Sequence, residues 1–286
     1  EETGVNLHIS HLKAMGEENW PLMDTALATI DKAYERGVNV AFDVYPYTNT
    51  GSVLYTLLPD WASEGGRKAM LARLRDNSIR SRIVREMEES LFDYSKIEIA
   101  ISPINKSLAR KKIVEIADSQ NKSPEEAVAD VLLASEGQVI ASMDVLSQEN
   151  VDKAIIHPLS IVSSNGSGYN LEHADSGELI HPRSFGTFPK VLREYVKEKK
   201  LLSWEEAIHK MTWKPAEKFS IPRRGKIKEG FFADVLVIDR EKIRDISSKD
   251  NPFQYSQGID FVLVNGRITL SGGEYQGGRF GELILN

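Results

Sequence analysis

The stretch VNVAFDVYPY, residues 38–47, has the pattern of a buried strand in a parallel sheet. Its early residues are apolar at successive positions, so both faces of the strand would be covered, as in sheets with helices on each side. Pro46 ends the strand, because proline cannot donate a hydrogen bond to a neighbouring strand. The sequence therefore predicts a strand at residues 38–44 and an α/β fold class.

The residues before this strand complete a βαβ unit. A helix is predicted over residues 21–36, with apolar side chains close to i, i+3, i+4 spacing; these are Leu22, Ala26, Leu27, Ile30 and Ala33. Gly37 follows it as a helix-terminating glycine. VNLHIS predicts an earlier strand at residues 5–10.

The chain beyond residue 50 changes in character twice. Residues 51–122 are rich in Arg, Lys and Glu and predict an inserted lobe. After residue 122 the sequence again predicts helices and strands in alternation, beginning with a helix that opens at Ser123. The further elements are predicted at residues 138–142 (strand), 148–156 (helix), 159–162 (strand), 189–199 (helix) and 204–211 (helix). After Pro222, short strands separated by glycine-rich turns predict an all-β segment.

These changes predict two domains. Residues 1–221 are expected to form part of a (β/α) barrel, with the lobe inserted at about 51–122. Residues 222–286 are expected to form a β-sandwich segment.

Composition excludes several classes of function. The 286 residues are 41% hydrophobic and 27% charged, with a net charge of −6, so no basic surface for nucleic acid is expected. Cysteine is absent, which excludes disulfides and thiolate metal sites, and no 18-residue apolar run would span a membrane. We expect a cytoplasmic protein. The chain enters a strand almost at once without a leading Met, which favours a fragment of a longer protein and leaves open a signal upstream.

Four of the histidines can be placed by their context. His11 follows a strand at the edge that carries the active site in (β/α) barrels, and neutral imidazole is a common zinc ligand. On general grounds a hydrogen-bonding role is the more frequent one for such a residue. His8 is expected to pack in the interior, His157 to interact with a helix dipole, and His209 to be structural.

Three other side chains lie where chemistry is usually placed. Tyr45, in DVYPYT, could pack at the strand end or contact a substrate. Arg183, in a predicted loop HPRSFGTF at residues 181–188, could clamp a carboxylate or form a salt bridge. Asn165 ends the strand in LSIVSSNGSG, residues 159–168, where a carboxylate would be expected; Asn-Gly is also a common turn dipeptide.

Six motifs in one order give the chain a resemblance to a known family. They are HISHLKAMGEENW, DVYPYT, HPRSFGTFPKVLREYV, EEAIHKMTWKPAEKF, RGKIKEGFFADVLVID and GIDFVLVNGRI. Together they resemble the N-acyl-D-amino-acid deacylases (D-aminoacylases) of the amidohydrolase superfamily. The resemblance covers nearly the whole chain, apart from part of residues 51–122.

The resemblance implies a (β/α)8 TIM-like barrel of which this chain supplies the C-terminal portion. Residues 5–10, 38–44 and 159–162 would be strands six, seven and eight, followed by the β-sandwich segment. The family's His-rich motif of strand one and its strand-five histidine have no match here. At roughly 30 residues per βα unit, about 150–250 residues would be absent. A separate N-terminal half is then a candidate partner.

The resemblance also assigns roles. It implies that His11 binds Zn²⁺ and that Lys13, Tyr45 and Arg183 contact the substrate. Asn165 falls where the family has a catalytic Asp, which takes a proton from zinc-bound water and passes it to the leaving amine. An amide cannot accept that proton at neutral pH.

The predicted function is zinc-dependent hydrolysis of the linear amide of N-acyl-D-amino acids, impaired in this chain by Asn165 and by the absent half. Three alternatives stay open: a non-catalytic ligand-binding relative, an amidohydrolase such as a dipeptidase acting on a different amide, and a structural half that pairs with a separate chain.

Overall fold

A three-stranded parallel sheet lies at the centre of the computed structural model, which describes residues 2–90, 92–176 and 178–284. Its strands are β1 (Leu7–Ile9), β2 (Val40–Val44) and β6 (Ser160–Val162), in the order β1-β2-β6. All five residues of β2 are buried, and Phe42 is fully enclosed. The strand predicted at residues 38–44 is therefore present as the central strand of this sheet.

Helices cover the sheet and bury its side chains. After the short turn η1 (Glu17–Asn19), α1 (Leu22–Glu35) packs on β2, while α7 (Gln148–Ile156) and α9 (Trp204–Met211) pack on β6. The short helix α10 (Trp213–Lys218) continues from α9. The α1 side chains buried against the core lie three and four residues apart, as its apolar pattern predicts; they are Met23, Leu27 and Ile30.

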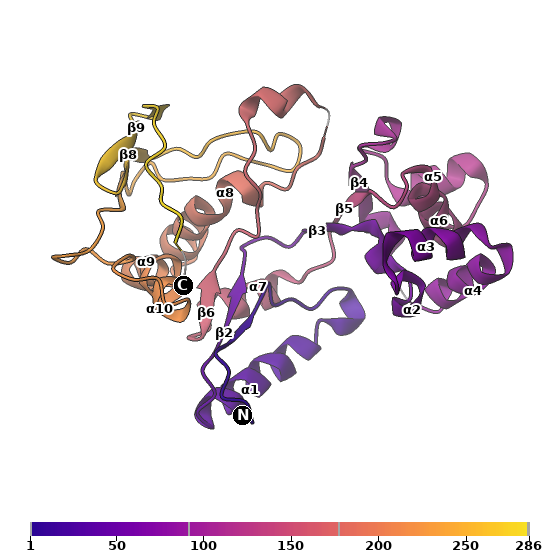
Figure 1. Cartoon of the computed structure of the whole chain (residues 1–286), viewed down its shortest axis with the longest axis horizontal. Coiled ribbons are helices and arrows are strands. Elements are labelled where there is room, and N and C mark those ends of the chain that lie inside the picture. The colour runs from indigo at the N-terminus through magenta and orange to yellow at the C-terminus, as the bar shows by residue number, and fades with distance from the viewer. Residues whose placement is uncertain (1, 91, 177, 285–286) are drawn as a thin grey trace.

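A lobe stands to one side of the parallel sheet (Figure 1). Its antiparallel sheet has the order β3-β5-β4, with β3 (Thr50–Val53), β4 (Ile97–Ile101) and β5 (Ile140–Met143). The helical segments of the lobe are η2 (Leu54–Leu57), α2 (Asp60–Ser63), α3 (Gly66–Arg75), α4 (Asn77–Glu88), η3 (Tyr94–Lys96), η4 (Lys106–Leu108), α5 (Ile113–Gln120) and α6 (Pro124–Ala134).

The lobe is larger than the predicted insertion at about 51–122. The helix α6 packs on α3, α4 and α5, and β5 pairs with β3 and β4, so both belong to the lobe. A buried strand has the same local pattern in a parallel or an antiparallel sheet. The partners of a strand are set by contacts distant in sequence, so the local pattern does not show that the lobe extends beyond residue 122.

The segment HPRSFGTF is helical, whereas the sequence predicted a loop before a helix at residues 189–199. Following the short η5 (Leu171–Ser176), α8 (Arg183–Lys190) runs directly into η6 (Val191–Glu198), which has π-type hydrogen bonding. Pro182 precedes the first turn, and Nδ1 of His181 accepts the Arg183 N–H at 3.0 Å. Pro189 lies inside the helix, where its missing N–H accompanies the change of helical type.

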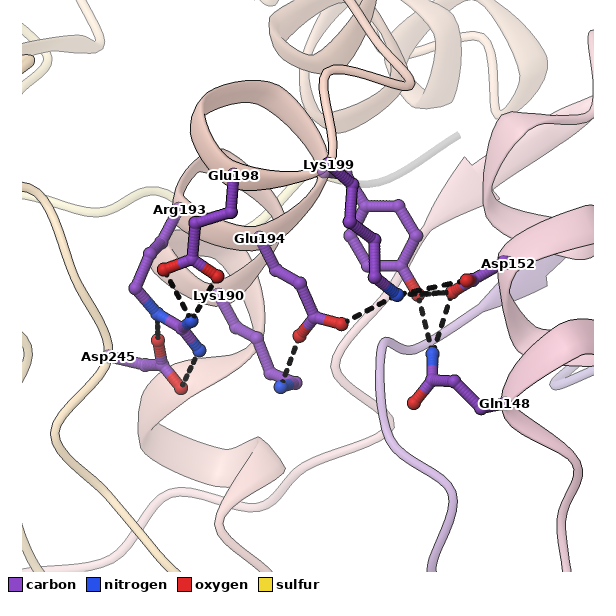
Figure 2. A network of polar contacts seen from close by, with 9 residues as sticks. Gln148, Asp152, Lys190, Arg193, Glu194, Glu198, Lys199 and Asp245 are labelled. Carbon is purple, nitrogen blue, oxygen red and sulfur yellow. Dashed lines mark hydrogen bonds and ion pairs between the residues drawn. The ribbon is translucent and has the colours of Figure 1, made fainter.

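A network of charged side chains fastens η6 to its neighbours (Figure 2). Asp152 of α7 accepts hydrogen bonds from Tyr195 at 2.6 Å and from Lys199 at 2.9 Å. On the other side, Arg193 bonds Asp245 at 2.7 Å, which anchors the loop that joins the first two strands of the C-terminal sheet. The helix that begins with Arg183 is thus held at both sides.

Asp152→Asn is expected to lower the free energy of unfolding by about 1–3 kcal/mol, because it weakens bonds to a buried hydroxyl and to an ammonium group. Burial alone would raise the pKa of Asp152, but its hydrogen bonds outweigh burial and lower the pKa. A depressed folded-state pKa means that the carboxylate stabilises the fold above its unfolded pKa of about 3.9 and ceases to do so as pH falls through the folded value.

Urea denaturation at pH 7 and at pH 3 measures this contribution. The exposed Asp118 of α5 is the control, since Asp118→Asn should leave the midpoint unchanged. Equal midpoints for the Asp152 variant and the unchanged protein at pH 7 would contradict the assignment.

The C-terminal strands form one antiparallel sheet in the order β10-β9-β8-β7, with β7 (Val235–Ile238), β8 (Ile259–Val264), β9 (Arg267–Ser271) and β10 (Glu274–Tyr275). Apolar side chains on it are exposed, among them Leu236 and Ile268. The all-β character after Pro222 is confirmed, and the β-sandwich stays a prediction. Among the described helices, none has the length and apolarity needed to cross a bilayer.

Candidate functional site

The carboxyl ends of the parallel strands meet at one edge, and His11, Tyr45 and Asn165 each follow a different strand there. His11 and Asn165 both adopt left-handed backbone conformations, with φ of 44° and 45°. Such values are uncommon for residues other than glycine and collect at turns and functional sites. The chain turns sharply at this edge, next to the candidate residues.

The carboxylate of Asp43 organises the turn after β1. One oxygen accepts the His11 N–H at 2.9 Å, and the other lies 2.7 Å from Nε2 of His8. The backbone carbonyl of Asp43 accepts the N–H of Leu12, also at 2.9 Å. A buried carboxylate whose two oxygens are both bonded holds the strained His11 backbone in place.

The side chain of His11 points away from these contacts into an exposed position. Its Nδ1 accepts a hydrogen bond from the Lys13 ammonium group at 3.0 Å. Burial, followed by the positive charge of Arg183, lowers the pKa of Lys13 to about 8, against the opposing effect of Asp43. The His11 imidazole and a partly desolvated cation therefore lie side by side.

Tyr45 lies beneath two cations. Its ring is buried, and its hydroxyl donates to Oγ1 of Thr50 at 2.9 Å. The Arg183 guanidinium lies 5.0 Å from the ring centroid and the Lys13 ammonium 5.8 Å from it. Burial is the main cause that raises the pKa of Tyr45, so the phenol stays protonated near neutral pH.

The guanidinium of Arg183 has donors that the described residues leave without a partner. Its Nε and Nη1 are buried and make no hydrogen bond in the described structure. Buried polar groups are nearly always bonded, so an exception calls for an explanation. Between the clamp and the salt bridge that the sequence left open, this geometry favours the clamp, since the recorded ion pairs of the described chain do not include Arg183.

His181 fixes the backbone from which Arg183 projects. Its Nδ1 accepts the Arg183 N–H, so the proton resides on Nε2, which donates to the carbonyl of Asn49 at 2.9 Å. Burial, together with the charge of Arg183, lowers the pKa of His181 to about 3. This imidazole is neutral and structural.

A cavity of about 220 Å³ opens beside Arg183, between the lobe sheet and the loop after β6. Asn165 lines it, with its side chain exposed and its N–H donating to Oγ of Ser163 at 3.4 Å. A Cβ on Gly166 would lie 2.8 Å from the Cα of Ser184, so glycine allows this loop to approach α8. The Asn-Gly pair thus serves the loop geometry, and it also places Asn165 at the cavity.

Residues 174–270 match the amidohydrolase family. An N-acyl-D-glutamate deacylase from Alcaligenes xylosoxydans xylosoxydans is 31% identical over 264 residues, 92% of this chain and 45% of that protein. An N-acyl-D-aspartate deacylase from the same organism is 38% identical over 152 residues, 53% of this chain and 28% of that protein. The chain is related to the N-acyl-D-amino-acid deacylases.

A solved structure supports this relationship. The N-acyl-D-glutamate deacylase from Bordetella bronchiseptica, complexed with zinc and a phosphonate that mimics the tetrahedral intermediate, superposes with a TM-score of 0.72. The sequences are 29% identical, over 94% of this chain and 47% of that one. The chain therefore has the α/β amidohydrolase fold and spans less than half the length of the deacylases it matches.

The donor set at the edge does not make a metal centre by itself. Zinc in proteins takes about four ligands, three or more from side chains. Within residues 2–90, 92–176 and 178–284, no group of three or more His, Asp or Glu is arranged to hold an ion. His11 fits as a single exposed imidazole ligand, whereas both oxygens of Asp43 are already bonded.

The five residues picked out from the sequence divide into two adjoining groups. His11, Lys13 and Tyr45 line one small hollow, and Asn165 and Arg183 line the larger cavity. Arg183 joins the two by lying over Tyr45. Of the other histidines, His8 is only partly buried, with its Nε2 2.7 Å from the Asp43 carboxylate.

Sequence reasoning missed two contributors to this region. One is Asp43, and an acid on a buried strand is itself a signal for a fixed partner. The other is Lys249, which lines the larger cavity from a loop more than 60 residues beyond Arg183 in the chain. No local sequence pattern predicts that this lysine lies at the cavity.

Proposed function

We propose that this chain supplies the substrate-binding edge of a zinc-dependent amidohydrolase that cleaves the linear amide of N-acyl-D-amino acids. The products would be a carboxylic acid and a free D-amino acid. The observation that carries the proposal is the Arg183 guanidinium beside Tyr45 and Lys13, whose Nε and Nη1 have no hydrogen-bond partner among the described residues. A guanidinium with spare donors suits a ligand carboxylate, with which arginine makes charge-assisted hydrogen bonds.

Lys13 adds a second positive charge to the same spot. The repulsion from Arg183 that helps to lower the pKa of Lys13 would be offset by a bound carboxylate. Two neighbouring cations without a bound anion repel each other, and an anionic ligand would offset this repulsion. The two cations and the Tyr45 ring beneath them are therefore proposed as the substrate-binding residues.

His11 is proposed as one neutral imidazole ligand to Zn²⁺. Zinc, where bound, polarises an amide carbonyl and lowers the pKa of a bound water. The described residues do not complete its ligand set, so the chain's own contribution is one ligand held by Asp43.

Asn165 is proposed to occupy the position of the family's catalytic Asp. An amide can hold a water or a carbonyl by hydrogen bonds but cannot accept a proton at neutral pH. Hydrolysis by this protein should therefore be slow.

The barrel assignment belongs to the same proposal. β1, β2 and β6 would be the sixth, seventh and eighth strands of a (β/α)8 barrel, which the parallel order of these neighbours supports. β7 to β10 would form part of a β-sandwich. A cytoplasmic location and a separately supplied N-terminal half stay predictions.

Asn165 favours a second candidate function, a relative that binds the ligand without hydrolysing it. Measuring the binding and hydrolysis of N-acetyl-D- and N-acetyl-L-amino acids, with Zn²⁺ present, tests both. D-selective binding with slow amine release supports the enzyme, and D-selective binding with no release supports the binding protein. Equal affinity for the two enantiomers, or no affinity for either, would overturn the proposal.

A further inference from the structure

We propose that the cavity beside Arg183 holds the side chain of the bound amino acid and selects uncharged side chains over acidic ones. Lys249, neutralised by Glu98 and Asp144, sets this selectivity. The inference rests on the proposed function, because it takes Arg183 as the site of the substrate's α-carboxylate.

The covalent structure of an amino acid places its side chain in this cavity. The α-carboxylate and the side chain of an amino acid are bonded to the same carbon. If the α-carboxylate binds Arg183, the first side-chain atom therefore lies two bonds from the carboxylate carbon, close to Arg183. Arg183 lines the larger cavity, whereas His11 and Lys13 line the neighbouring hollow. The amide therefore extends toward His11 and the side chain toward the lobe sheet.

The lining of the cavity is mostly neutral. Apolar walls come from the lobe sheet and from the segment bonded to β4, and they are Val53, Ile101, Ile140 and Leu179. The hydroxyl of Ser142 accepts a hydrogen bond from Asn49 at 2.6 Å. Such a surface accommodates an apolar or an uncharged polar side chain.

Lys249 would be the natural partner of an acidic side chain, but it already has two carboxylates. Its Nζ lies 2.9 Å from Oδ2 of Asp144 and 3.2 Å from Oε2 of Glu98. One ammonium and two carboxylates carry a net charge of −1, and of the three groups Lys249 is the one that lines the cavity. A further carboxylate placed beside Lys249 would therefore meet a cation that is already neutralised, with a net negative charge around it.

The Lys249 position is well anchored. Its loop is tied at one point by the Arg193 bond to Asp245, seen in Figure 2, and at another by Oγ of Ser247, which donates to the carbonyl of Pro252 at 2.6 Å. Glu98 projects from β4, a paired strand of the lobe sheet. The three charged groups are thus held by separate elements.

The inference predicts that this chain prefers other substrates than those in the names of two relatives. Those relatives are an N-acyl-D-glutamate and an N-acyl-D-aspartate deacylase, whose substrates carry a second carboxylate. The pairing of Lys249 predicts that this protein disfavours such substrates.

The test compares two ligands of nearly equal shape, N-acetyl-D-glutamine and N-acetyl-D-glutamate, by isothermal titration calorimetry on the full protein. The unchanged protein should bind the glutamine compound about tenfold more tightly. The double variant Glu98→Gln, Asp144→Asn frees Lys249 and should shift that ratio about tenfold or more toward glutamate. Adding Lys249→Met to the double variant should abolish the shift.

Matched controls keep the result interpretable. Asp24 forms a surface pair with Lys153 at 2.8 Å, on α1 and α7, so Asp24→Asn should leave the ratio unchanged. The single variant Glu98→Gln, which should give part of the shift, serves if the double variant does not fold.

Three results would overturn the inference. Binding of both compounds with a ratio that the double variant does not change overturns it alone, and so does a preference of the unchanged protein for glutamate. Folded protein that binds neither compound overturns the proposed function and this inference with it.

Discussion

Asn165→Asp, made in a chain that carries a complete set of zinc ligands, should raise the rate of N-acyl-D-amino-acid hydrolysis by about 10²–10⁴-fold, the usual contribution of a general acid–base group. A carboxylate at this position can accept a proton and return it to the leaving amine, which an amide cannot do. The side chain at residue 165 is exposed and lines the cavity beside Arg183, so the new carboxylate would be accessible. Amine release from N-acetyl-D-amino acids in the presence of Zn²⁺ measures the change.

Asn121→Asp is the matched control for this exchange. Asn121 follows α5, is also exposed, and has a left-handed φ of 52°, close to the 45° of Asn165. The control adds an equal charge outside the cavity lining and should leave the rate unchanged. If Asn165→Asp gives no increase while D-selective binding persists, the protein is a binding relative and not an impaired enzyme.

The central strand of the sheet could be predicted because burial determines most of its sequence. Every residue of β2 is buried, and all of them except Asp43 are apolar. The helix α1 could be predicted for the corresponding reason, since only one of its faces meets the sheet. The local sequence pattern is sufficient to predict a helix or strand when the burial of each residue depends only on its position within that helix or strand.

The lobe and α8 were harder because their structure depends on distant contacts. IASM in β5 reads as a buried strand, but nothing in those four residues shows that its partners are β3 and β4. HPRSFGTF contains Pro, Gly and Ser and reads as a loop, yet it begins a helix whose N-terminus His181 supports through a side-chain bond.

The candidate site, like the fold, could be predicted from the sequence only in part. The resemblance implied that His11 binds Zn²⁺ and that Lys13, Tyr45 and Arg183 contact the substrate. The structure brings Lys13 and Arg183 over the Tyr45 ring. Whether Arg183 has an ionic partner could not be read from the sequence, because a partner can come from any part of the chain. The same holds for Lys249, whose two carboxylates lie more than 100 residues before it.

The second large effect is expected from Arg183→Met, which should weaken binding of N-acetyl-D-amino acids roughly 10–150-fold, corresponding to about 1.5–3 kcal/mol for hydrogen bonds to a charged group. The same change should raise the free energy of unfolding by about 1–3 kcal/mol. Two buried donors that the described residues leave unbonded are removed, and Met replaces them with an apolar side chain that adapts to the space. Calorimetric titration and urea denaturation measure the two effects.

Arg193→Met provides the contrast, because Arg193 is bonded to Asp245 at 2.7 Å and to Glu198 at 2.8 Å. Its removal leaves the nearly buried Asp245 carboxylate without its main partner, so this variant should lower stability. Two arginines on one continuous helical segment are thus expected to shift stability in opposite directions, because Arg193 is paired within the protein and two donors of Arg183 have no partner among the described residues. A loss of stability from both variants would mean that Arg183 has a structural role, and the carboxylate site would have to be sought elsewhere.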